Sequence, residues 1–151
     1  MYTEKRFEET KDLLKTLIEI PSVSGSEKKL AEYIASVLDE YGVDEVFLQE
    51  VKPARYNVRG TFRGGKPGKT TLLTGHLDVV SAGDGWKTPP FKAVEIDGRI
   101  YGRGSNDMKA GLAVMMQCIK IACENREKYP GNIEIAFLCD EEAYSIGANY
   151  L

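Results

Sequence analysis

Residues 70–78 read TTLLTGHLD, a short apolar and β-branched run that ends in a glycine, a histidine and an aspartate. Such a run, with turn residues before it, predicts a strand. His76 is the only histidine of the chain and would lie at the carboxyl end of this strand. Because ligand sites of α/β sheets collect at the carboxyl ends of strands, this stretch predicts both a sheet and the place of a site.

Two amphipathic helices are predicted before this strand. The first carries leucine and isoleucine at helical spacing and ends at Pro21, since the residue before a proline disfavours the helical region. The second begins at a capping-box sequence from Ser24 to Glu27 and ends at Gly42, which supplies a left-handed stop.

Short β-rich runs and one further helix complete the pattern. Strands are expected at residues 43–51, 57–62 and 70–74, with residues 64–68 as a hairpin turn between the last two. Asp97-Gly98 predicts a tight hairpin between residues 92–96 and 99–101. A helix over residues 108–128 then leads to an apolar strand at 132–139. Helices interleaved with strands indicate an α/β sandwich with a largely covered sheet.

Composition excludes several classes of protein. Of 151 residues, 42% are hydrophobic and 28% charged, which is typical of one globular domain. The net charge of −3 and the lack of a basic block argue against nucleic acid as a partner. Apolar stretches far shorter than the roughly 20 residues of a membrane span, and an amino terminus without a signal-peptide core, predict a cytoplasmic protein that does not enter the membrane. Cys118, Cys123 and Cys139 are expected to be reduced, buried thiols.

His76 and Asp78 form the first candidate site. Residues two apart in an extended segment point the same way, so the Asp78 carboxylate can accept a hydrogen bond from the imidazole. That bond would leave the other ring nitrogen free to bind a metal. The alternative is an ordinary hydrogen-bonded histidine at a strand end.

Acidic residues form two further candidates. Asp107 follows a glycine-rich turn, and its alternative role is to cap the helix after it. Its carboxylate also argues against a dinucleotide site there, because it would repel a pyrophosphate. Asp140, Glu141 and Glu142 follow the last strand. They are either a solvated turn that caps a helix, or a cation site in which one glutamate binds metal while its neighbour faces substrate and water. One imidazole with carboxylates suits zinc best.

The order of motifs resembles the metallopeptidase family that contains acetylornithine deacetylase, succinyl-diaminopimelate desuccinylase, aminoacylase and glutamate carboxypeptidase. The resemblance extends over nearly the whole chain and rests on Thr74-Gly75-His76-Leu77-Asp78-Val79-Val80, Trp86 with Thr88-Pro89-Pro90-Phe91, Asp97-Gly98-Arg99-Ile100-Tyr101-Gly102-Arg103-Gly104, Asp107-Met108-Lys109, and Asp140-Glu141-Glu142 with Gly147-Ala148.

This resemblance implies a fold, a site and a chemistry. The fold would be a three-layer α/β sandwich with a mixed, mostly buried β-sheet flanked by helices. His76 would bind one zinc ion, Asp107 would bridge two, and Glu142 would bind the second, with cobalt as a substitute metal. Asp78 would orient His76, and Glu141 would be the general base. The peptide bond between Asp107 and Met108 would be cis. The substrate would be a small N-acyl amino acid or a short peptide, cleaved at an amide bond by a metal-activated water.

Members of this family are considerably longer. The resemblance therefore implies that residues 1–151 are the amino-terminal portion of a catalytic domain. The lid or dimerisation domain and the carboxyl-terminal part, including a second ligand histidine, would be absent. A different class of function stays open, namely a catalytically inactive truncated scaffold or a self-associating module of the same fold. An aminopeptidase of the broader zinc clan is a third reading.

Overall fold

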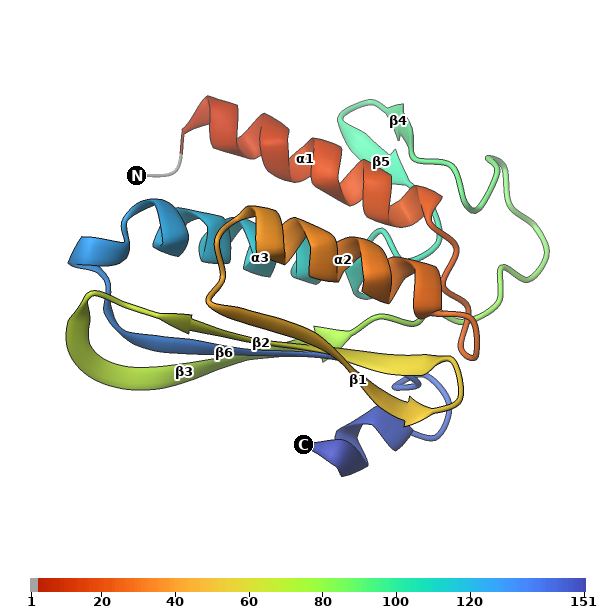
Figure 1. Cartoon of the computed structure of the whole chain (residues 1–151). Helices are drawn as coiled ribbons and strands as arrows, with labels where there is room; N and C mark the ends of the chain where they lie inside the picture. Colours follow the sequence, from red (N-terminus) through yellow and green to blue (C-terminus); the bar gives the residue numbers. More distant parts are fainter. Residues whose placement is uncertain (1–2) are drawn as a thin grey trace.

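Four strands form a mixed sheet in the order β1-β2-β6-β3. A computed structural model describes residues 3–151 (Figure 1). Residues 1–2, the first two of the domain predicted over residues 1–151, lie outside the described residues. The strands are β1 (Glu45–Lys52), β2 (Arg55–Arg63), β3 (Lys66–His76) and β6 (Pro130–Leu138). The β1/β2 and β2/β6 pairs are antiparallel, whereas β3 and β6 are parallel. The predicted strands are thus confirmed.

The predicted hairpin between β2 and β3 is wrong, because β6 lies between them. Ile133, Ile135 and Phe137 of β6 are buried, and a strand of this kind is stabilised in the middle of a sheet, where it pairs on both edges. The residues after β2 contact the β6 side instead of closing a hairpin. The N–H of Gly64 donates to Gly131 O at 2.9 Å, and that of Gly65 donates to Arg126 O at 2.8 Å.

Three α-helices of the described chain lie on one side of this sheet (Figure 1). They are α1 (Glu4–Glu19), α2 (Lys28–Glu40) and α3 (Lys109–Glu124). Helix α2 packs on β1 and β2, α3 packs on β3, and α1 packs on α3. Their apolar faces and the inner face of the sheet form one core, which includes Leu17, Leu30, Ile34, Leu38, Val58, Phe62, Leu112, Met116, Ile119, Ile135 and Phe137.

Two helix boundaries differ from the prediction. Helix α3 ends at Glu124, and residues Arg126–Lys128 form a separate 3-10 turn, η1. The Arg126 guanidinium donates to the carbonyls of Gly42 and Arg63, which connects this segment to the turn after α2 and to the end of β2. The capping box at Ser24–Glu27 is also absent, because the Glu27 side chain makes no cap bond to α2 and pairs with Arg55 instead.

The predicted small hairpin is confirmed as β4 (Val94–Ile96) and β5 (Arg99–Tyr101). Asp97 and Gly98 at its tip have φ of 50° and 71°, as a tight hairpin turn requires. The cysteines are free, as expected, but only Cys139 is buried; Cys123 is half-buried and Cys118 is exposed. Cys118 lies on the α3 surface turned away from the core.

The mixed α/β fold with helices flanking the sheet is confirmed. On the side opposite the α-helices, the described chain places the short 3-10 helix η2 (Ile146–Tyr150) against β1 (Figure 1). The two edge strands depart from the expected mostly buried sheet: β3 is exposed along most of its length, and in β1 only Val51 is buried. Among the helices of residues 3–151, none has the length and hydrophobicity to cross a bilayer.

Gly131, at the start of β6, is the tightest point between β6 and β3. It has φ of 76°, and a Cβ there would lie 1.9 Å from Lys69 O. Only glycine therefore allows the β3 and β6 backbones to approach at this point.

We expect Gly131→Ala to reduce the free energy of unfolding by about 2 kcal/mol more than Gly83→Ala does. Gly83 has a similar φ of 68° but nothing within 4 Å of a built Cβ, so the pair separates backbone strain from steric conflict. Urea denaturation of both variants measures the difference. Equal losses would contradict the close approach.

Candidate metal centre

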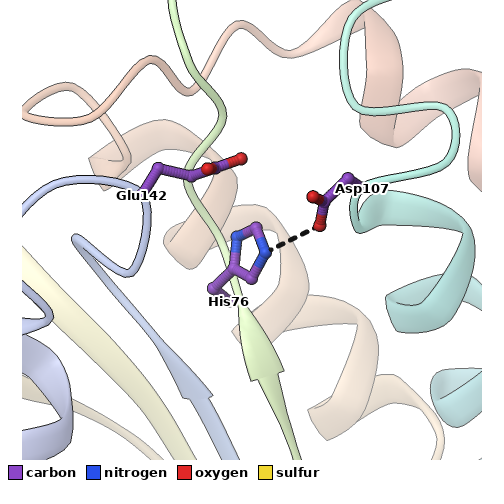
Figure 2. A group of neighbouring side chains, drawn as sticks. All are labelled: His76, Asp107 and Glu142. Carbon is purple, nitrogen blue, oxygen red and sulfur yellow. Dashed lines mark hydrogen bonds and ion pairs between the residues drawn. The ribbon is translucent and has the colours of Figure 1, made fainter.

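Three side chains from separate segments converge at one end of the sheet (Figure 2). His76 ends β3, Asp107 precedes α3, and Glu142 lies in the turn after β6. Each offers a ligand atom, and these atoms all lie within 4.8 Å of one another. The parallel pairing places His76 opposite Leu138, so the carboxyl ends of β3 and β6 meet at the same edge, as predicted.

The His76 ring is oriented by a backbone carbonyl. Its Nδ1 lies 2.9 Å from Asp78 O, and since a carbonyl oxygen only accepts hydrogen bonds, Nδ1 is the donor. Its Nε2 faces Asp107 Oδ1 at 3.1 Å (Figure 2). In the neutral imidazole these are two acceptor atoms in contact, so a proton or a metal ion is needed between them. This geometry suits a metal ligand.

The Asp78 carboxylate differs from its predicted role. It lies 3.6 Å from His76 Nδ1, beyond hydrogen-bond distance. Its oxygens accept instead from the N–H of Glu141 at 2.9 Å, the N–H of Glu142 at 3.1 Å and the Ser24 hydroxyl at 2.7 Å. Asp78 is fully buried. It thus orients the imidazole through its carbonyl and the acidic turn through its carboxylate.

Negative charge accumulates around the imidazole. The pKa of Glu142 is raised, first because the carboxylate is partly desolvated and second because Asp107 lies nearby. Glu141 is 53% exposed, and its Oε2 lies 3.7 Å from His76 Nε2. A bound cation would offset this repulsion, and imidazole and carboxylate are both usual ligand types for catalytic zinc.

The segment that carries Asp107 is anchored by its neighbours. Lys109 is fully buried, and its Nζ donates to Leu17 O at 2.7 Å and Ile20 O at 2.8 Å, at the end of α1. Burial lowers the pKa of Lys109 to about 8. The bond between Asp107 and Met108 is cis, as the family resemblance implied. Asp107 does not cap α3, since its N-cap is Met108 without a side-chain bond, so the capping alternative fails.

A buried ionic cluster behind the acidic turn was missed by the sequence analysis. Arg55 pairs with Glu27 and Asp140. Burial would lower the pKa of Arg55, but the hydrogen bonds to both carboxylates raise it. For the Asp140 carboxyl, burial alone would raise the pKa. Hydrogen bonds from Arg55 and from two backbone amides instead hold the pKa of Asp140 below its usual value. Glu27 matched a capping box, and no sequence signal pointed to a partner at Arg55.

Residues 72–151, more than half of the chain, match the profile of Peptidase family M20/M25/M40. The chain belongs to this family. All three converging side chains lie within the matched residues, which is consistent with the family resemblance noted from the motifs.

Relatives within this family are longer than the chain. The succinyl-diaminopimelate desuccinylase of Sulfurimonas denitrificans is 34% identical over 133 residues, which cover 88% of this chain and 34% of that protein. Human carnosine dipeptidase 1 matches 99% of this chain and 37% of its own, with a TM-score of 0.83 and 24% identity. Bacillus subtilis YXEP, described as a dinuclear metal binding peptidase from the M20 family, matches 93% of this chain and 37% of its own, with a TM-score of 0.67 and 17% identity. The chain spans about a third of the length of these proteins.

Asp78→Asn should destabilise the protein by about 2 kcal/mol, because an amide group replaces one acceptor oxygen and faces N–H donors. Asp84→Asn, at an exposed loop position, is the matched control and should stay within about 0.5 kcal/mol of the wild type. Chemical denaturation with both variants tests this. A neutral effect of Asp78→Asn would contradict the role assigned to this carboxylate.

Proposed function

We propose that this chain is the amino-terminal portion of the catalytic domain of a zinc-dependent hydrolase, which cleaves an amide bond of an N-acyl amino acid or a short peptide. The observation that carries the proposal is the convergence of His76, Asp107 and Glu142 in a member of a peptidase family. The desuccinylase and dipeptidase names of the relatives support this class of substrate.

The donor atoms would serve two metal positions. His76 and Asp107 would hold one zinc ion, and Asp107 and Glu142 would hold the second. The name of the B. subtilis protein supports a metal pair. Zinc, when bound, lowers the pKa of a water and polarises a carbonyl. Cobalt is expected to substitute in the same ligand set, which makes it a spectroscopic probe.

Glu141 serves as the general base. Its carboxylate is half-exposed and lies near the imidazole, so it is free to accept a proton from the attacking water and pass it to the leaving amine. The Asp78 carboxylate positions Glu141 by accepting a hydrogen bond from the Glu141 backbone N–H. Asp107 is 72% exposed, so a substrate can reach this end of the sheet.

The remaining sequence-based expectations stay predictions. They are a cytoplasmic location, small-molecule substrates with no nucleic acid or membrane partner, and self-association. The exposed β3 edge favours the alternative function, a self-associating scaffold of the same fold, since unpaired strand edges recruit further strands. Light scattering of the purified chain distinguishes the hydrolase from the self-associating scaffold. A monomer across a wide range of protein concentrations would contradict the scaffold.

The two adjacent glutamates provide a matched test of the metal site. With tag-free protein, Glu142→Gln should weaken Co²⁺ binding at least about tenfold, because it removes a ligand, whereas Glu141→Gln should bind as the wild type does. Titration followed by the visible d–d bands of Co²⁺ measures both. The reverse order of effects would exchange the roles of the two residues, and equal binding by all three proteins would reject the site.

The 151-residue chain by itself should hydrolyse N-acyl amino acids negligibly and hold zinc weakly. Each metal position receives only two protein ligands from it, whereas catalytic zinc sites have three. Metal analysis after dialysis, together with an amidase assay at saturating zinc, checks this expectation. Tight stoichiometric zinc with robust turnover would contradict the proposal that the site is partial.

A further inference from the structure

A buried ionic cluster of Glu27, Arg55 and Asp140 lies behind the acidic turn. Glu27 is fully buried and Asp140 nearly so. The Arg55 guanidinium donates from Nε to Glu27 Oε2 at 2.7 Å and from Nη2 to Glu27 Oε1 at 2.5 Å. The same Nη2 donates to Asp140 Oδ1 at 2.7 Å. Arg55 thus joins the loop before α2 to the end of β6.

The cluster is better suited to fix a position than to add stability. A buried ion pair often contributes no more to stability than apolar residues of similar volume would. The planar guanidinium, however, sets the direction of each carboxylate that it binds, which a lysine ammonium does not do. Within residues 3–151, Arg55 is the cation that the ion pairs place between these two carboxylates.

Asp140 connects Arg55 to the turn that carries Glu141 and Glu142. Its backbone is left-handed, with φ of 67°. While Oδ1 is held by Arg55, Oδ2 accepts from the N–H of Tyr144 at 3.2 Å and of Ile146 at 3.5 Å. Its carbonyl accepts from the N–H of Ser145 at 2.6 Å. The turn that carries Glu141 and Glu142 therefore closes around a residue whose side chain Arg55 holds.

The loop before α2 contacts the same turn by a second route, through Asp78. The Ser24 hydroxyl donates to the Asp78 carboxylate, which accepts the N–H groups of Glu141 and Glu142. Three residues later, Glu27 pairs with Arg55. The acidic turn is thus fixed from two sides, through Asp78 and through Arg55.

We propose that Arg55 and Glu27 are positioning residues of the metal centre, which set the place of the acidic turn and so the distance from the Glu142 carboxylate to the His76 ring. The effect on metal binding rests on the proposed function, whereas the effect on the turn does not.

Arg55→Lys is the principal variant, because it keeps the charge but loses the planar fork that reaches both carboxylates. Arg63→Lys is its matched control. Arg63 lies on the same strand and pairs with Glu45 at 2.6 Å on the surface, where both side chains are more than half exposed. The double variant Glu27→Gln with Arg55→Gln removes the planar fork but keeps a neutral amide donor for the Asp140 carboxylate. It should show the same faster amide exchange and weaker Co²⁺ binding, and it decides the question if Arg55→Lys does not fold. Ile119→Val, a buried change in α3 away from the turn, controls for a general loss of stability.

Two measurements separate the position of the turn from metal binding. Amide hydrogen exchange by NMR, on metal-free protein, reports the hydrogen bonds of the Glu141 and Glu142 N–H groups. Co²⁺ titration reports affinity and, through the d–d bands, ligand geometry. In Arg55→Lys we expect both amides to exchange at least about tenfold faster and Co²⁺ to bind about 10- to 100-fold more weakly with altered bands. Arg63→Lys and Ile119→Val should match the wild type at these amides and in the bands.

The outcomes are distinguishable. A folded Arg55→Lys with the exchange rates and Co²⁺ spectrum of Arg63→Lys overturns the positioning role. The same loss in Ile119→Val also overturns it, since a general loss of stability would then suffice. If the wild type binds no Co²⁺ but the two amides exchange faster in Arg55→Lys, the proposed metal function fails while the positioning of the turn stands.

Discussion

The buried carboxylate of Asp78 is the interaction on which the site depends. Burying an anion is costly unless donors surround it, and here two backbone N–H groups and a hydroxyl do so. Those donors belong to the loop before α2 and to the turn after β6, while the carbonyl of Asp78 orients His76. One residue therefore connects the end of β3, which carries His76, to the turn that carries Glu142 and to the loop before α2.

The parallel pairing of β3 and β6 brings His76 close to the acidic turn. Because β3 and β6 are parallel neighbours, His76 and the acidic turn leave the sheet at the same edge, although residues 77–129 separate the two strands in the chain. Asp107 reaches that edge from the start of α3, whose first turn is held against the end of α1 by the buried Lys109. The exposed carboxylate of Asp107 thus belongs to a firmly held backbone. A rigid frame with accessible anionic side chains is what a metal-assisted hydrolase needs.

Much of the site and fold was predictable from local sequence. His76, Asp107, Glu142 and Glu141 stand directly after strands or a turn, and those elements have clear periodicity. Strand order was less accessible: residues 64–68 look like a hairpin turn, yet β6, which follows some 65 residues later in the chain, inserts between β2 and β3. The roles of Glu27 and Arg55 were missed for the same reason, since Arg55 binds partners 28 and 85 residues away. Ser24-x-x-Glu27 is a valid capping box locally, and only the tertiary ion pair overrides it.

The central claim is that His76, Asp107 and Glu142 together form a site for divalent cations. Crystals of the chain grown with zinc, with diffraction data on both sides of the zinc absorption edge, test it most directly. We predict an anomalous peak about 2.0 to 2.2 Å from His76 Nε2 and from a carboxylate oxygen of Asp107. A map with zinc bound only elsewhere, at saturating zinc and with this edge of the sheet free of crystal contacts, would contradict it.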